Sequence, residues 1–403
     1  EYFVNFSVTT VEPEPLIPAG YEIAYDQFQL PIQAEKRIYK ANGPALTTAT
    51  SGDELTVSSS KVNFVFNKKS GLVTSYKVDG TEYFKDGFGI QPNFWRAPND
   101  NDYGNGAPKR LQVWKQSSKN FHVTDVKMTT ENKVVSLKAT YLLAAGNLYV
   151  VTYRIYPSGI VNVSAQFTST DMQAAETEVS EATRMATFTP GSDAARKAAS
   201  KLEVPRIGVR FRLPAQMNNV QYFGRGPEEN YIDRNHGTLV GVYKTTADKM
   251  YFNYVRPQEN GHHTDTRWIA LSPDKGNGLA IVADSLIGFN ALRNSIEDFD
   301  SEEALPHPYQ WNNFSPEEVA NHDEKAARNV LRRMHHVNDI TPRDFVEVCV
   351  DMKQQGVGGY DSWGARPEPF HQIPANRDYS WGFTLVPVRS ASQANEVAKY
   401  DYQ

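Results

Sequence analysis

YRIYPSGIVNVSAQF, residues 153–167, is the stretch from which the fold can be read. A tight turn at residues 157–159 separates two runs in which apolar and polar side chains alternate. In the second run the apolar positions are Val161, Val163, Ala165 and Phe167, and the polar positions are Asn162, Ser164 and Gln166. Because successive side chains of a strand leave opposite faces, this period of two predicts a β-hairpin with one face toward a core.

The same alternation recurs at residues 61–67, 208–214 and 346–352. Turn residues separate these runs and no regular succession of helices lies between them, so antiparallel pairing is favoured. The prediction is an all-β chain dominated by a large antiparallel β-sandwich. Helix is expected from residue 315, where SPEE offers a capping box, and in the alanine-rich residues 192–203.

Composition predicts the domain organisation. Residues 1–33 begin with the strand-like EYFVNFSV, and because that strand has no partner before it we expect further sequence upstream. Residues 34–60 are rich in Pro, Gly, Thr and Ser and are predicted to be a linker. No further linker interrupts residues 61–389, and residues 61–403 are predicted to form one large domain.

Charge and hydropathy exclude two classes of partner. The 403 residues carry a net charge of -5 and show no basic stripe, so nucleic-acid binding is not expected. No apolar run approaches the roughly 20 residues of a membrane span, and the first ten residues do not have the pattern of a signal peptide. The compartment is not indicated. The single cysteine, Cys349, lies in a strand-like run and is predicted to be buried, with no disulfide framework or thiolate metal site.

Several carboxylates are candidates for acid–base chemistry, which in retaining glycosidases needs two carboxyl groups about 5 Å apart. Glu228 and Glu229 in GRGPEENY are adjacent, so in extended backbone they diverge, and we predict structural roles such as pairing with Arg225 or Arg234. The segment PQENGHH contains Glu259, His262 and His263. A turn is favoured there over a metal site, because adjacent histidines rarely reach one ion.

Two polar segments are candidates for ligand binding. In FWRAPNDNDYGNG, residues 94–106, the part beyond Pro98 is predicted to be an exposed loop that could bind sugar hydroxyls, or a cation through Asp100 and Asp102, or could simply be a solvated turn. In GVGGYDSWGARP, residues 356–367, glycines disfavour both helix and strand. A large aromatic such as Trp363 on this loop suggests contact with a ligand.

Four of these segments together carry a family resemblance. FWRAPNDNDYG, YFGRGPEENYIDR, YVRPQENG followed by TRWIAL, and GGYDSW occur in an order that resembles the carboxy-terminal region of the large bacterial β-galactosidases of glycoside hydrolase family two. The likeness spans nearly the whole chain. It implies that residues 1–33 close an immunoglobulin-like domain and that the main body is the final, galactose-mutarotase-like sandwich.

The resemblance also implies where the chemistry lies. In that family the two catalytic glutamates and the magnesium and sodium sites belong to an upstream (β/α)₈ barrel, and nothing in this chain has the pattern of eight strand–helix units. No catalytic residue, metal ligand or cofactor is therefore expected here. The expected substrate-binding residues are Trp363 and Asp361 at the pocket wall, and Asn101, Asp102 and Gly104 in an element that binds substrate or gates the pocket.

The resulting hypothesis is a non-catalytic portion of a β-galactosidase that is inactive alone. It would bind carbohydrate beside its own barrel domain, within a full-length homo-oligomer. One alternative is a free-standing mutarotase-type aldose epimerase, drawing acid and base from Glu228, Glu259 and His262. A carbohydrate-binding module is the other alternative.

Overall fold

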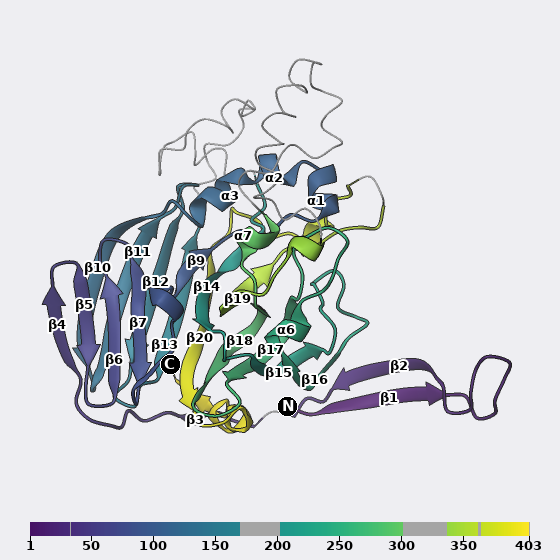
Figure 1. Ribbon diagram of the computed structural model, residues 1–403, viewed down its shortest axis with the longest axis horizontal. Helices are drawn as coiled ribbons and strands as arrows, with labels where there is room; N and C mark the ends of the chain where they lie inside the picture. Colours follow the sequence, from purple (N-terminus) through teal and green to yellow (C-terminus); the bar gives the residue numbers. More distant parts are fainter. Residues whose placement is uncertain (33, 170–201, 301–336, 362–363, 403) are drawn as a thin grey trace, which may run out of the picture.

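The computed structural model describes residues 1–32, 34–169, 202–300, 337–361 and 364–402 (Figure 1). Strands dominate these residues and pair antiparallel almost throughout, which confirms the predicted all-β class. The helix expected from residue 315 lies outside the described residues, as does the alanine-rich segment up to residue 201. None of the described helices has the length and apolarity required to cross a bilayer.

A twelve-stranded sheet forms the body of the described chain. Its main path runs through β10 (His122–Glu131), β11 (Val134–Leu142), β12 (Leu148–Ile155), β13 (Val161–Thr168), β20 (Tyr379–Val388), β18 (Gly278–Leu292), β17 (His263–Ser272), β15 (Asn219–Gly226) and β16 (Leu239–Thr246). The long strand β18 also pairs with β19 (Phe345–Gln354), which continues to β14 (Arg206–Pro214) and β9 (Gln91–Asn93). Three strands thus branch from the middle of the sheet.

The predicted hairpin at residues 153–167 is present as β12 and β13, with Tyr153 opposite Val163. The apolar residues of β13 are buried as the alternation requires. Asn162, predicted on a polar face, is buried as well, because β13 is flanked by β12 and β20 and its amide donates to Thr384 Oγ1 at 3.0 Å. A buried polar side chain is tolerated when it has such a partner.

A second, five-stranded sheet packs in front of β10–β13 (Figure 1). It consists of β4 (Thr47–Ser51), β5 (Glu54–Ser58), β6 (Val62–Asn67), β7 (Leu72–Val78) and β8 (Thr81–Glu82). The ring of Phe64 on β6 lies 5.7 Å from that of Tyr153 on β12, and Tyr76 on β7 donates to Gly159 O at 2.6 Å. These contacts join the two sheets around one apolar core.

The predicted linker at residues 34–60 is too long, because residues 47–58 form β4 and β5 of this sheet. The Thr- and Ser-rich composition is typical of loops, but threonine also favours strands, and Leu55 and Val57 of β5 are buried. The strand β4 lies at the sheet edge and is fully exposed, which explains its polar sequence. The division into domains stays a prediction.

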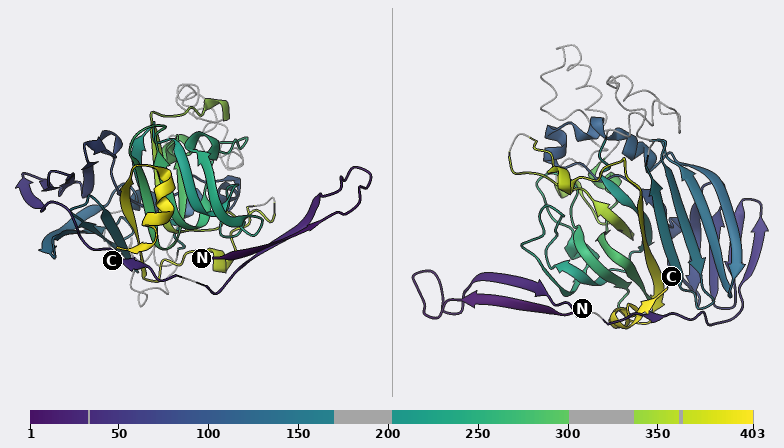
Figure 2. Two further views of the ribbon diagram at one scale, coloured as in Figure 1. Left: turned by 90° about the horizontal axis from the view of Figure 1, so that it is seen from below. Right: turned by 180° about the vertical axis from the view of Figure 1, so that it is seen from behind.

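The first strands form a separate hairpin of β1 (Phe3–Thr9) and β2 (Glu22–Gln29), which projects away from both sheets (Figures 1 and 2). At its base the Gln27 side chain donates to Val240 O at 2.9 Å and accepts from Val240 N at 2.8 Å. After this hairpin, β3 (Arg37–Ile38) pairs in parallel with β21 (Tyr400–Asp401), which lies near the end of the chain. This pairing ties residues 37–38 to the main body.

Short helices complete the described chain. They are α1 (Asp100–Gly104), α2 (Ala107–Arg110), α3 (Gln112–Ser117), α6 (Ala247–Met250), α7 (Ile296–Phe299) and α9 (Ala394–Val397), with 3₁₀ turns η1 (Lys85–Gly87), η5 (Val337–Asp339), η6 (Pro369–His371) and η7 (Ala391–Gln393). The first three follow one another across one end of the sheets (Figure 1). The candidate site lies at α1.

Candidate functional site

Three segments that lie far apart in the sequence meet at the candidate site. They are residues 94–106, the turn at residues 231–234 and the glycine loop, by which we mean the described residues 355–361 and 364–367. Figure 1 shows α1 next to the yellow-green strand-free segment that follows β19. The contacts between them come from side chains that bind loop backbone.

Arg96 is the first of these side chains. Its guanidinium is buried and donates from Nη1 to Gln355 O at 2.7 Å and from Nη2 to Gly356 O at 3.0 Å. The same Nη2 forms an ion pair with Asp102 Oδ1 at 3.1 Å. A planar guanidinium has several donors in fixed directions, so one side chain can join α1 to the glycine loop.

The expectation of an exposed loop beyond Pro98 is wrong, because residues 100–104 form α1 with a capping box. The Asn99 side chain accepts from Asp102 N at 2.9 Å, and Asp102 Oδ2 accepts from Asn99 N at 3.1 Å. Asparagine and aspartate favour turns for the same reason that they cap helices, since their short side chains bind nearby backbone. Asp102 is buried; substrate contact by it stays a prediction.

The two acidic side chains proposed for a cation each have a cationic partner. Asp102 pairs with Arg96, and Asp100 pairs with Arg256 at 3.4 Å. Within the described residues no group of three or more His, Cys, Asp or Glu side chains is placed to hold a metal ion. Asn101 instead donates to Val357 O at 3.3 Å, so it lies against the glycine loop.

Asp233 also binds the backbone of the glycine loop. Its Oδ1 accepts from Val357 N at 3.0 Å and its Oδ2 from Gly358 N at 2.8 Å. Gly358 has φ +66, a conformation that glycine adopts without strain. Two adjacent N–H groups on one carboxylate form charge-assisted hydrogen bonds, which are stronger than neutral ones.

The loop also packs directly on the end of α1 at Gly364. A Cβ at Gly364 would collide with the backbone of Gly104 and Asn105, so this contact has no room for a side chain. Asp361 accepts from Ala365 N at 3.0 Å and is exposed, as is Gly104. Trp363 lies outside the described residues, so its predicted contact with sugar stays a prediction.

The structural role predicted for Glu229 is confirmed. Its Oε1 accepts from Arg234 at 2.7 Å and from the Tyr254 hydroxyl, and its Oε2 accepts from Gly261 N at 2.6 Å. Glu228 is exposed. Arg225 has a different partner from the one considered, because it forms an ion pair with Asp265. The two adjacent glutamates thus face different surroundings.

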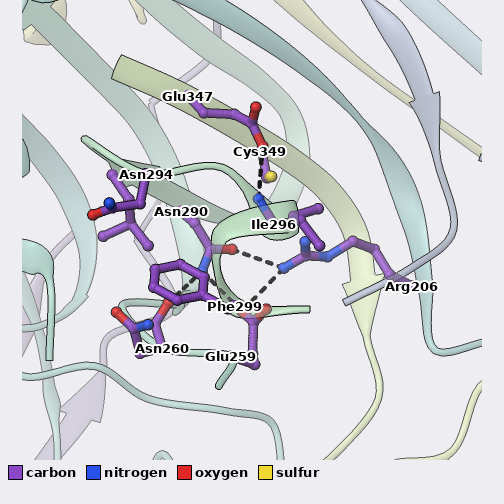
Figure 3. A pocket seen from close by; sticks show the side chains of 10 residues that line it. Arg206, Glu259, Asn260, Asn290, Asn294, Ile296, Phe299, Glu347 and Cys349 are labelled. Carbon is purple, nitrogen blue, oxygen red and sulfur yellow. Dashed lines mark hydrogen bonds and ion pairs between the residues drawn. The ribbon is translucent and has the colours of Figure 1, made fainter. Parts of the chain in front are cut away.

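Glu259 belongs to a buried polar cluster on the sheet (Figure 3). Arg206 donates from Nη2 to Glu259 Oε1 at 3.2 Å and to Asn290 Oδ1 at 2.8 Å. His262 lies against the same Asn290 Oδ1 at 2.9 Å, and burial holds its pKa well below the usual value. The adjoining cavity is about 20 Å³, enough for one water molecule and far too small for a sugar ring.

This arrangement bears on the epimerase alternative. Glu259 and His262 are buried in the cluster, whereas Glu228 lies exposed on the surface. An acid and a base must both reach the substrate in one open site. The three residues named for that alternative do not share one.

Comparison with known proteins identifies the family. Residues 58–385 match the family described as the β-galactosidase small chain. The chain belongs to this family. Among curated members, the β-galactosidase of Priestia megaterium is 32% identical over 391 residues, covering 96% of this chain and 32% of that protein. The β-galactosidase of Streptococcus thermophilus is 25% identical over 377 residues, covering 92% and 30%. This small-chain sequence therefore spans about a third of the length of these relatives.

Solved structures that match this chain include a galactose 1-epimerase from Lactobacillus acidophilus, with a TM-score of 0.41, 9% identity, and coverage of 86% of this chain and 98% of that one. A putative mutarotase from Salmonella typhimurium gives a TM-score of 0.38 and 9% identity, with coverage of 88% and 97%.

Two residues of this small-chain region were not singled out from the sequence. Arg96 lies in WRAP and Asp233 in YIDR, both inside the segments that carry the resemblance. The sequence signal for both is that each is a charged residue inside a family motif, and neither has been given a role by the sequence reasoning. Their partners are the backbone of the glycine loop, which residue patterns do not reveal.

Proposed function

We propose that this chain is the non-catalytic carboxy-terminal portion of a β-galactosidase of glycoside hydrolase family two. In the full-length protein a barrel domain hydrolyses terminal β-D-galactosides, and this chain completes the wall of the sugar pocket. The observation that supports it is the convergence of WRAPNDND, YIDR and GVGG, distant in sequence, on one glycine loop. A loop whose backbone is held by side chains from several segments of a rigid scaffold is typical of a binding element.

Residues of the loop and of α1 would then have distinct tasks. The indole of Trp363 would lie against the C–H face of a galactosyl ring, which buries apolar area without engaging the hydroxyl groups. Asp361 and Asn101 would offer polar groups to those hydroxyls, and Asp102 would act beside them. Gly104 would serve as the hinge of a gating movement at the mouth of the pocket.

The chemical step is assigned to other parts of the full-length protein. Both catalytic glutamates, together with the magnesium and sodium ions that the family resemblance implies, would belong to the barrel domain. This chain would supply binding surface and subunit contacts in a homo-oligomer.

The test compares the full-length parent with this 403-residue chain on a chromogenic β-galactoside. We expect turnover by the parent and none by the chain. Turnover by the chain would contradict the non-catalytic assignment, and galactoside binding in calorimetry by a chain whose parent is inactive would favour a carbohydrate-binding module.

Trp363→Ala in the parent tests the pocket wall. We expect KM to rise about tenfold with little change in the unfolding temperature, since a stacked aromatic ring contributes about 0.5–1.5 kcal/mol beyond the apolar area that it buries. Phe370→Ala is the matched control, because Phe370 is a 72% exposed aromatic near the loop with no assigned role. Equal loss of stability and affinity in Trp363→Ala would point to a core role.

A further inference from the structure

The turn that carries Asp233 is itself firmly held. Tyr231 and Arg234 pair across it, with Arg234 N donating to Tyr231 O at 2.7 Å. Tyr231 is buried and stacks on the His262 ring at 5.5 Å, while Arg234 binds Glu229. These contacts fix the backbone of the turn. The Asp233 side chain therefore extends to the glycine loop from a backbone position that is itself held in place.

The peptide groups around Val357 are held on both sides. Asp233 accepts from the N–H groups of Val357 and Gly358, and the Val357 carbonyl accepts from the side chains of Asn99 and Asn101, each at 3.3 Å. Arg96 binds the two preceding carbonyls. Side chains from other segments thus set the backbone path at residues 355–358.

Asp233 differs from the other partners in two respects. It is the charged acceptor for adjacent N–H groups, so its removal would leave both donors without that partner. It also comes from the segment between β15 and β16, whereas Arg96, Asn99 and Asn101 come from the segment at α1. Asp233 therefore fixes the loop relative to a second, independent part of the scaffold.

We propose that Asp233 is a positioning residue for substrate binding: its carboxylate clamps the N–H groups of Val357 and Gly358 and thereby sets the orientation of the glycine loop. This role rests on the proposed function, in which that loop contributes to the sugar pocket. Without the clamp the loop occupies more conformations, and substrate binding must select the competent one. Affinity falls while the chemical step, which takes place on other residues, is retained.

The kinetic test uses Asp233→Ala and Asp233→Asn in the full-length parent with a chromogenic β-galactoside. We expect KM to rise about tenfold for Asp233→Ala with kcat changed by less than about twofold. Asp233→Asn keeps one acceptor oxygen but turns an N–H group toward the second donor, so it should fall between wild type and Asp233→Ala. Asp265→Asn is the matched control, because the carboxylate that it removes is partly exposed and pairs with the Arg225 side chain instead of with loop backbone.

A second measurement does not depend on activity. In this chain the amides of Val357 and Gly358 should exchange with deuterium slowly in the wild type and at least about tenfold faster in Asp233→Ala. Unprotected wild-type amides would overturn the clamp. An active parent whose KM is unchanged in Asp233→Ala would overturn the positioning role alone, whereas an inactive wild-type parent would overturn the proposed function on which it rests.

Discussion

Arg206 and Asp351 form an ion pair in the interior of the protein, with Nε of the first 3.3 Å from Oδ2 of the second. Arg206 also pairs with Glu259, so one buried cation faces two carboxylates. Burial raises the pKa of Asp351 to about 7, although the attraction of Arg206 opposes the shift, and Glu259 adds to it. A protonated Asp351 leaves Arg206 and Glu259 as a neutral pair, which is the less costly state in a low-dielectric interior.

Asp351 should make stability depend on pH. A carboxyl group whose pKa rises from 3.8 to about 7 on folding stabilises the folded state below the lower value, and this contribution is lost as pH rises toward the higher one. The loss amounts to at most about 4 kcal/mol. We expect the wild-type unfolding temperature to fall relative to Asp351→Asn between about pH 4 and 7, and the difference to be constant above about pH 8.

Cys349→Ala provides the control for that experiment, since Cys349 lies two positions away on β19 and is also buried. It should lower stability by a similar amount at each pH in this range. The neighbours that could contribute to the slope are Arg206, Glu259 and His262. A wild type whose stability parallels that of Asp351→Asn at every pH would contradict a protonated Asp351.

Gly208→Ala should destabilise the chain. Gly208 lies opposite Asp351 on the neighbouring strand, and a Cβ there would be 2.6 Å from Val350 O and would collide with Asp351 Oδ1. Crowding of this kind typically costs about 1–3 kcal/mol. Gly237→Ala should change urea unfolding by less than about 0.5 kcal/mol, because the nearest atom to its Cβ would be Tyr25 Oη at 3.9 Å. Equal effects of the two substitutions would contradict this prediction, because they would show that Val350 and Asp351 can move to make room for the added methyl group.

Arg96→Met should cost about 3–5 kcal/mol in urea unfolding, because it leaves the buried carboxylate of Asp102 without its cation. Asp102→Asn in the same background should recover part of the loss, since the amide needs no cation. The double variant should still lack the bonds from Arg96 to the loop carbonyls. If Arg96→Met and the double variant were equally unstable, the ion pair would not be the source of the effect.

Cys349 should not react with an aromatic disulfide reagent in the native chain. Its exposed fraction is 4%, so the reagent cannot reach the sulfur. Burial also raises the pKa of the thiol well above its usual value, so the reactive thiolate does not form. One equivalent should react on addition of denaturant. Reaction of the native chain at the rate of a free thiol would contradict the buried position of this residue.

Local patterns were enough for the main features of the fold. The alternation in residues 153–167 predicted both strands and the turn, because a sheet face imposes a period of two on any strand that borders a core. The same reasoning missed β4, which is polar because it lies at the sheet edge, and β5, whose alternation of Leu55 and Val57 is only five residues long and stands in a Thr- and Ser-rich segment. Residues 99–104 were mistaken for a loop because capping and turn formation use the same side chains.

The candidate site was only partly accessible to this reasoning. Family motifs drew attention to residues 94–106 and 356–367, but nothing in either segment shows that they touch. The partners of Val357 lie 124 residues away at Asp233 and 256 away at Asn101. A single sequence contains no information on such pairs, so only the assembled sheets reveal them.

The long sequence separations between the glycine loop and its partners have a consequence for protein engineering. Backbone bonds at residues 355–358 come from side chains between 124 and 260 positions distant, so a synthetic peptide copied from this loop would have no means of adopting the same shape. Transplanting the loop onto another sandwich would require the equivalents of Arg96 and Asp233 to be moved with it. The unit that evolution can exchange is therefore the whole corner of the scaffold, not the peptide.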